Sequence, residues 1–321
     1  MTHTSPREAA EVPAIVAEIA HEADDVKSLR LAPVSGDQIP AWEPGAHIDL
    51  VLGPGLERQY SLCGDPDDRH HWRIGVLREP ESRGGSSYVH DKLSVGDQVL
   101  CRGPRNNFAL ADAERYLFIA GGIGITPILP MIGRCEAAGK PWRLVYGGRQ
   151  EGSMAFRAEL APHGDRVTYW PQNVRGHLDL AALLGTPEAG TAIYCCGPGG
   201  LLDAVEQRCA VWPDDALHLE RFRPKDGALD GNNTEFEVVL DYSGITLAVA
   251  PDQSIVEAAE AAGVHIPTSC REGTCGTCET VVLEGEPDHR DSYLTPREKE
   301  SGEVIMPCCS RACSKTLVLD L

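Results

Sequence analysis

Residues 270–278 read CREGTCGTC, and this stretch decides the fold of the C-terminal part of the chain. It spaces three cysteines as Cys270-x4-Cys275-x2-Cys278. Such spacing is typical of plant-type [2Fe–2S] sites, where a compact loop presents three thiolates to one side of the cluster. Gly273 and Gly276 would let the loop backbone pass close to the cluster sulfides, because glycine carries no Cβ. The stretch therefore predicts an iron–sulfur centre.

The fourth ligand has three candidates, Cys308, Cys309 and Cys313. The segment MPCCSRA (306–312) is similar to a ferredoxin segment in which one cysteine precedes Ser-Arg-Ala, and this alignment favours Cys308 over Cys309. Structural zinc is the main alternative metal, but zinc sites prefer paired CxxC knuckles or CxxC combined with histidines. The x4 spacing and the flanking glycines disfavour zinc.

A second motif, RQYSL (58–62), lies in the N-terminal third of the chain and suits a flavin. Tyr60 could cover the isoalloxazine ring, the Ser61 hydroxyl could approach N5, and Arg58 could pair with the phosphate. The turn RGGSS (83–87) then leads into a helical pattern. Free N–H groups and the helix dipole converge at such a turn, which favours a flavin phosphate there.

A third motif, GGIGITP (121–127), follows a buried strand and opens a helix, an arrangement that lets a dinucleotide pyrophosphate approach the backbone. It is not the GxGxxG form. Cys196 ends a later strand of the same predicted sheet and could face the nicotinamide, because loops at the carboxyl ends of parallel strands line the ligand crevice. Arg149 ends another strand and could contact the adenosine side, although an exposed surface arginine is an equal interpretation. For Cys195, packing in the core is the preferred interpretation.

The chain has 321 residues, which predicts two or three domains. Short β-type runs such as HIDLVL (47–52) and HWRIGVL (71–77) predict an antiparallel barrel or sandwich before about residue 110. Strands then alternate with helical patterns, including SMAFRAELA (153–161) and HLDLAALL (177–184), which predicts a doubly wound parallel sheet. Residues 221–236 form a polar linker by composition, and SIVEAAEAAG (254–263) predicts a helix that ends at Gly263.

Composition excludes several partner classes. The formal net charge of −19 argues against nucleic acid and anionic membranes, and it permits steering toward a basic partner surface. No apolar run is long enough for a transmembrane helix, and the N-terminal residues carry no secretory pattern, so a cytoplasmic location is expected. Twelve cysteines in such a chain point to metal ligation rather than disulfides.

Taken together, the motifs resemble the phthalate dioxygenase reductase family, which includes the vanillate O-demethylase reductases. The resemblance runs from about residue 12 to 321 and rests on these motifs in family order: RQYSL, RGGS, AGGIGITPIL, YCCGPGGLLDAV, HLERF, SCREGTCGTC and DHRDSYL…MPCCSRA…LVLDL. It implies a multidomain α+β protein with an antiparallel β-barrel flavin domain (12–112), an α/β NAD-binding domain (113–224), a linker (225–234) and a β-grasp ferredoxin domain (235–321).

The resemblance also implies cofactors and residue roles. FMN, a [2Fe–2S] cluster and NADH as co-substrate are expected. Electrons would pass from NADH to FMN, then to the [2Fe–2S] cluster, and finally to a partner Rieske-type oxygenase acting on an aromatic compound. Alternatives are a cytochrome P450 as the acceptor, an FAD-type reductase of similar domain order, and a non-enzymatic redox sensor. Ser61 and Cys196 are the expected catalytic residues. The expected cofactor-binding residues are Arg58, Tyr60, Ser61, Gly84, Gly85, Ser86, Gly122, Thr126, Arg149, Cys196 and Phe222. The expected metal ligands are Cys270, Cys275, Cys278 and Cys308.

Overall fold

Strands with alternating apolar residues open the chain in this computed structural model, which describes residues 10–53 and 55–321. Six of them form an antiparallel sheet in the order β4-β3-β6-β1-β2-β5. An isolated bridge between Leu62 and Ile74 links the ends of the two edge strands, so the sheet curls into a barrel around Val16, Leu29 and Ile48. The elements are β1 (Glu11–Ala23), β2 (Val26–Pro33), β3 (Ala46–Gly53), β4 (Leu56–Ser61), β5 (Trp72–Leu77), α1 (Gly85–Asp91) and β6 (Gln98–Asn106).

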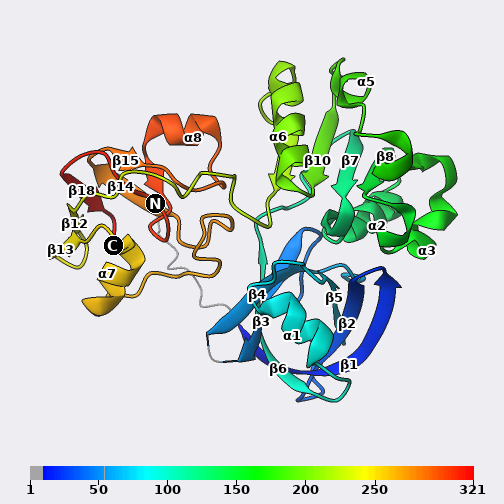
Figure 1. The fold of residues 1–321 in the computed structure, drawn as a ribbon, viewed down its shortest axis with the longest axis horizontal. Coiled ribbons are helices and arrows are strands. Elements are labelled where there is room, and N and C mark those ends of the chain that lie inside the picture. Colours follow the sequence, from blue (N-terminus) through cyan, green and yellow to red (C-terminus); the bar gives the residue numbers. More distant parts are fainter. Residues whose placement is uncertain (1–9, 54) are drawn as a thin grey trace. The chain divides into compact units, whose positions relative to one another are not determined.

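A five-stranded parallel sheet follows, in the order β11-β10-β7-β8-β9 (Figure 1). Strand β7 shows why both of its faces are covered: Phe118 and Ala120 belong to one apolar core, and Leu117 and Ile119 belong to another. Helix α2 supplies side chains to the first core, whereas α5 and α6 supply the second. The predicted doubly wound arrangement is therefore present. Its strands are β7 (Arg115–Gly121), β8 (Trp142–Gly148), β9 (Val167–Pro171), β10 (Thr191–Cys196) and β11 (Leu217–Glu220).

The helices of this part differ in length. The two long ones are α2 (Ile128–Ala138) and α6 (Gly199–Arg208), and the short ones are α3 (Arg157–Leu160), α4 (Gln172–Arg175) and α5 (Leu180–Leu184). Single 3-10 turns are η1 (Gly122–Ile125), η2 (Glu151–Ser153), η3 (Ala161–Arg166) and η4 (Cys209–Val211).

The barrel and the parallel sheet belong to one unit that ends at Glu220. Arg73 on β5 ties them together: it donates to Glu22 of the barrel, forms an ion pair with Glu159 of α3, and lies 4.8 Å from the centre of the Phe156 ring. Gly75 allows a further close contact, since a Cβ there would come within 2.8 Å of the Thr126 side chain.

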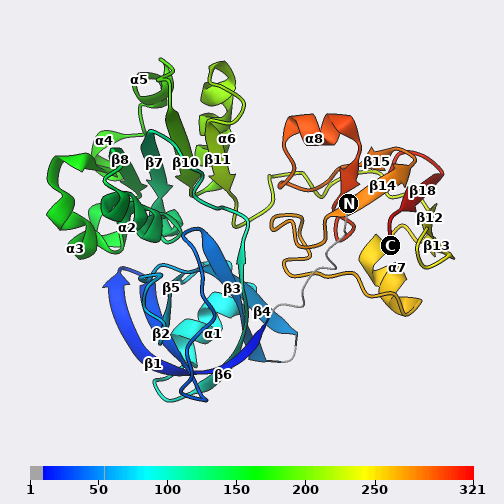
Figure 2. The same ribbon diagram turned by 180° about the vertical axis from the view of Figure 1, so that it is seen from behind.

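A separate unit begins at Arg221 and holds a sheet in the order β13-β12-β18-β14-β16, with β12 and β18 parallel (Figure 2). Helix α7 packs on it through Ile255, Val256 and Ala259. Ser254 caps this helix by accepting from the Glu257 N–H at 3.2 Å, and Gly263 follows its end with a φ of +82°. The elements are β12 (Phe236–Leu240), β13 (Ile245–Val249), α7 (Ile255–Ala261), β14 (Thr280–Glu284), β15 (Pro287–Asp288), α8 (Pro296–Ser301), β16 (Val304–Ile305), β17 (Arg311–Ala312) and β18 (Thr316–Leu319).

Two predicted helices are shorter than expected. In SMAFRAELA only Arg157–Leu160 is helical, because Phe156 adopts a left-handed φ of +60° and Met154 to Phe156 insert their side chains into the core instead. In HLDLAALL the helix begins only at Leu180, where Asp179 caps it. Among the described residues, none of the helices is long and apolar enough to cross a membrane.

Candidate functional site

The iron–sulfur loop gathers its cysteines at one place in the second unit. The sulfur of Cys308 lies beside those of Cys270 and Cys278, and Cys270 also lies beside Cys275. Contact with Cys275 and Cys308 lowers the pKa of the Cys270 thiol, and the Cys270 contact raises the pKa of Cys275. The structure therefore brings together the four cysteines predicted as ligands.

Polar groups of the loop lie close to two of these sulfurs, Cys270 and Cys275. The N–H groups of Glu272 and Thr274 point at Cys270 Sγ from 3.3 and 3.4 Å. The Thr277 hydroxyl lies 3.2 Å from Cys275 Sγ. Hydrogen bonds to the sulfurs tune the reduction potential of such centres. Four neighbouring thiols, with two backbone N–H donors aimed at Cys270, fit a [2Fe–2S] cluster.

The other two cysteines of this unit differ from each other, because the side chain of Cys309 also lies beside that of Cys308, whereas Cys313 stands apart. Cys309 is half-buried and sits against the loop at Gly273, where an added Cβ would come within 2.4 Å of its sulfur. Cys313 is exposed, with its sulfur 3.9 Å from the Pro287 carbonyl. The sulfur of Cys308 thus lies among the loop thiols, and that of Cys313 lies outside the group.

The structure adds a second reason for the two loop glycines, whose close approach to the cluster sulfides stays a prediction. Gly273 and Gly276 have positive φ angles of 70° and 69°, so the loop needs glycine for its conformation. A Cβ at Gly276 would also come within 2.4 Å of the Tyr293 ring. Close contact with neighbouring protein atoms therefore also favours glycine at both positions.

The predicted flavin residues lie on β4 in the first unit. Tyr60 packs against the barrel core, and burial raises the pKa of its phenol to about 12, so the ring stays neutral. Ser61 is buried. Arg58 donates to the Arg83 carbonyl at 2.5 Å and so connects the strand to the glycine turn.

The predicted phosphate turn packs directly on that arginine. A Cβ at Gly85 would come within 2.4 Å of the Arg58 side chain, and Gly84 has a left-handed φ of +94°. The Ser86 hydroxyl donates to Ser82 Oγ and accepts from the Glu79 N–H at 3.1 Å. A guanidinium and a turn that tolerates only glycine form a cradle whose chemistry fits the phosphate of a flavin mononucleotide.

The two predicted nucleotide loops touch backbone to backbone. A Cβ at Gly124 would come within 2.3 Å of the Cys196 carbonyl oxygen, and a Cβ at Gly121 within 2.6 Å of Pro198. Gly122 faces open space with a φ of +55°. The Thr126 hydroxyl donates to the Ile123 carbonyl at 2.9 Å and is buried. The glycines therefore let the loop after β7 close onto the end of β10.

A buried carboxylate that the sequence did not single out joins the flavin strand to the nucleotide loop. Glu220 ends β11 directly opposite Cys196 in the parallel register. Its Oε2 accepts from the Ser61 hydroxyl at 3.4 Å and lies 3.9 Å from the Cys196 sulfur. Burial raises the pKa of Glu220 to about 8, and burial also raises that of Cys196. Both groups hold their protons at neutral pH.

Two other predicted cofactor-binding residues, Arg149 and Phe222, have exposed side chains. The Arg149 side chain is exposed beyond the end of β8, and its carbonyl accepts from the Asn173 N–H at 3.0 Å. Phe222 belongs to the second unit and is 40% exposed. Glu220 could have been found from the motif HLERF, where it closes a strand that follows the Cys196 strand in sequence.

Comparison with known proteins places these sites in context. Residues 238–313 match the model of the 2Fe-2S iron-sulfur cluster binding domain, and residues 118–207 match the oxidoreductase NAD-binding domain. The vanillate O-demethylase oxidoreductase of Pseudomonas sp. (strain HR199 / DSM 7063) is 43% identical over 93% of this chain and 96% of its own. The structure of a phthalate dioxygenase reductase matches with a TM-score of 0.70 at 36% identity, over 97% of this chain and 98% of that one. The chain belongs to the phthalate dioxygenase reductase family.

This membership confirms the predicted fold class, the reductase class, the [2Fe–2S] cluster and the nicotinamide nucleotide. An intact type IV self-sufficient cytochrome P450 monooxygenase also matches, with a TM-score of 0.87 at 45% identity over 97% of this chain. This chain spans only 41% of that longer protein.

Proposed function

We propose that this reductase carries electrons from NADH through FMN and the [2Fe–2S] cluster to a Rieske-type oxygenase that acts on an aromatic compound. The observation that carries the proposal is the meeting of Ser61 and Cys196 at one carboxylate, in a chain whose other unit gathers four cysteines. When bound, FMN accepts two electrons as a hydride and releases them one at a time, as the cluster requires.

The flavin site would use Arg58, Tyr60 and Ser61, with the turn at Gly84, Gly85 and Ser86 around the phosphate. Arg58 pairs with that phosphate while it holds the turn through the Arg83 carbonyl. Tyr60 stays neutral and covers the ring system. The turn is short and already packed on Arg58, which favours FMN over the larger FAD.

The nicotinamide would lie where the loop after β7 meets the end of β10. Gly122 offers open backbone there, and Thr126 fixes its turn. Cys196 would shape the nicotinamide site with a buried thiol that stays protonated. Glu220 would fix the position of Ser61 by accepting the hydrogen bond of its hydroxyl group. Arg149 would contact the adenosine end, and Phe222 would approach the flavin.

The cluster would be held by Cys270, Cys275, Cys278 and Cys308, with Cys309 outside the ligand set.

The proposed domain limits are 12–112 for the flavin domain, 113–224 for the nucleotide domain, 225–234 for the linker and 235–321 for the ferredoxin domain. We place the protein in the cytoplasm.

The terminal partner follows from the relatives. The vanillate O-demethylase oxidoreductase and the phthalate dioxygenase reductase are named for oxygenase systems acting on aromatic compounds. The net charge of −19 would favour a partner with a basic docking surface.

The visible spectrum of the purified protein, before and after anaerobic NADH, tests the proposal, together with extraction of the flavin. Overlapping flavin and iron–sulfur bands that bleach with NADH, with release of FMN, are the expected result. Release of FAD would reject the flavin assignment. A protein without iron and flavin bands would reject the whole electron chain.

A second candidate partner is a cytochrome P450, favoured by the match to the self-sufficient P450 monooxygenase. Reconstitution separates the two. The reductase would be mixed with the oxygenase component of a vanillate O-demethylase plus vanillate, or with a bacterial P450 haem domain under carbon monoxide. NADH-driven demethylation without P450 reduction supports the Rieske partner, and the reverse supports the P450.

A further inference from the structure

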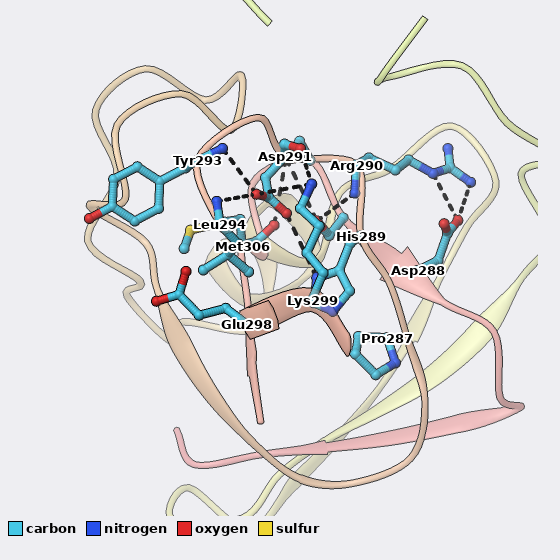
Figure 3. Close-up of polar contacts among 12 residues, drawn as sticks. Pro287, Asp288, His289, Arg290, Asp291, Tyr293, Leu294, Glu298, Lys299 and Met306 are labelled. Atoms are coloured by element: carbon cyan, nitrogen blue, oxygen red, sulfur yellow. Dashed lines mark hydrogen bonds and ion pairs between the residues drawn. The ribbon is translucent and has the colours of Figure 1, made fainter. Parts of the chain in front are cut away.

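A buried carboxylate, Asp291, lies directly behind the iron–sulfur loop. Its side chain is fully buried. One oxygen, Oδ2, accepts the backbone N–H groups of Tyr293 at 3.1 Å and Leu294 at 2.7 Å (Figure 3). The carboxylate therefore fixes the turn over residues 291–294.

Helix α8 supports the same turn through its lysine. The Lys299 ammonium donates to the Asp291 carbonyl at 2.5 Å and lies 3.5 Å from Oδ2 of its carboxylate. Thr295 caps the helix by accepting from the Glu298 N–H at 3.3 Å, so the short helix that carries Lys299 in its last turn begins at a defined residue. Turn and helix thus form one hydrogen-bonded support.

This support is fitted to the loop that carries three of the proposed cluster ligands. The Ser292 N–H donates to the Gly273 carbonyl at 2.8 Å. A Cβ at Gly273 would come within 2.8 Å of the Asp291 Cα, and one at Gly276 within 2.4 Å of the Tyr293 ring. Both glycines of the loop are therefore held by residues of the 291–294 turn, and movement of the turn would move the loop.

The charge of the carboxylate is only partly compensated. Its second oxygen, Oδ1, accepts no hydrogen bond from the described residues. The nearest ring nitrogen is His289 Nδ1, 3.7 Å away, and burial lowers the pKa of that histidine, which favours its neutral form. Lys299 is partly exposed, so solvent screens its charge more than that of Asp291. A buried charge is costly to keep, and here it lies behind the loop that carries three of the proposed cluster ligands.

We propose that Asp291 is a positioning residue for the [2Fe–2S] cluster, which locks the cluster loop through the 291–294 turn and holds the reduction potential low with a fixed negative charge. The proposal rests on the proposed cluster site. A negative charge opposes the arrival of an electron, and this repulsion is strong where water is excluded. The positive charge of Lys299 acts in the opposite direction, because it attracts the arriving electron and raises the reduction potential.

Three variants of the full-length protein test these two roles. Asp291→Asn keeps an oxygen for the Tyr293 and Leu294 N–H groups and removes only the charge. Asp291→Ala removes the charge and the turn bonds together. Asp241→Asn makes the same charge change at an exposed aspartate at the end of β12 and serves as the matched control.

The readouts are iron per protein, resistance of the visible bands to a chelator, and the cluster potential from a redox titration followed by EPR. We expect Asp291→Asn to retain iron and to favour the reduced cluster about tenfold, which corresponds to about 59 mV for a one-electron couple. Asp241→Asn should leave the potential unchanged, and Asp291→Ala should lose iron to the chelator several times faster than wild type.

Lys299→Met supplies an independent test if the Asp291 variants fold poorly, and it should shift the potential in the opposite direction. Equal potentials for Asp291→Asn and Asp241→Asn would overturn the electrostatic role. Wild-type chelator resistance in Asp291→Ala would overturn the positioning role. Absence of iron from wild-type protein would instead reject the cluster site itself, so the two failures are distinguishable.

Discussion

The two units use cysteine in opposite ways. Six cysteines lie in the unit that ends at Glu220 and six in the unit that begins at Arg221. In the first unit all six are buried. Burial raises the pKa of Cys63, Cys101 and Cys135 to about 12, so these thiols stay protonated and pack as small apolar groups.

In the second unit four cysteines, Cys270, Cys275, Cys278 and Cys308, lie beside one another, and backbone N–H groups point at Cys270. The loop that carries three of them bends through two left-handed glycines, a conformation that other residues rarely adopt. Comparison of the units shows that surroundings decide what a thiol does: a metal ligand needs neighbouring thiols and donors, whereas an isolated buried thiol serves packing. Four predictions test how surroundings set the role of a side chain in the two units.

The largest effect is expected from loss of the fourth thiol. Cys308→Ser should abolish the stable cluster, because the Cys308 sulfur lies beside both Cys270 and Cys278. The iron content and the visible iron–sulfur bands measure this. Cys309→Ser is the matched control next in sequence and should keep the cluster. If Cys309→Ser loses the iron and Cys308→Ser retains it, the two assignments are reversed.

The buried acid of the first unit should make stability depend on pH. The pKa of Glu220 is about 8 in the folded chain and near 4.5 when unfolded, so between those values the folded state binds more protons. Stability should fall by about 1.4 kcal/mol per pH unit as pH rises from about 5 to 8, and level off above that. Glu220→Gln should flatten this part of the profile, measured as Tm against pH. Parallel profiles for the two proteins would contradict the buried, protonated acid.

The same substitution should slow the reductase more modestly. Glu220→Gln keeps the shape but weakens the contacts to Ser61 and Cys196, so we expect about a tenfold loss in kcat for NADH-driven dye reduction. The KM for NADH should change little, because the residue acts through Ser61. Glu206→Gln is a control elsewhere in the same unit, on α6. A rise in KM at unchanged kcat would assign Glu220 to nucleotide binding instead.

Local patterns predicted much of the fold because each depends on few residues. The Gly263 stop and the cysteine spacing both act within about ten residues. Features that depend on distant contacts were missed or wrong. Glu220 matters only because the parallel register sets it opposite Cys196 and near Ser61. Phe156 breaks the predicted helix because the core takes its ring, and nothing in SMAFRAELA signals this.

The candidate site also contains local features, which the sequence predicted, and contacts between distant residues, which it did not. The motifs located the flavin strand, the glycine turn and both nucleotide loops, since these carry unusual residue types in short runs. The contact of Gly276 with Tyr293 escaped sequence analysis because Tyr293 lies in another segment. The support by Asp291 is equally non-local, since it joins a turn, a helix and the cluster loop.

The smallest effect is expected for an isolated cysteine of the first unit. Cys101 is fully buried in the barrel core among apolar side chains, and the thiol has no ligand role there. Cys101→Ala should therefore cost only the lost packing of one sulfur, about 1 kcal/mol, or about 2–4 °C in Tm for a domain of this size. Cys101→Val restores much of the volume and should recover part of that loss. Iron content and the visible spectrum should stay at wild-type values in both variants, because this thiol belongs to the other unit. A loss of iron from Cys101→Ala would break the contrast between packing cysteines and ligand cysteines.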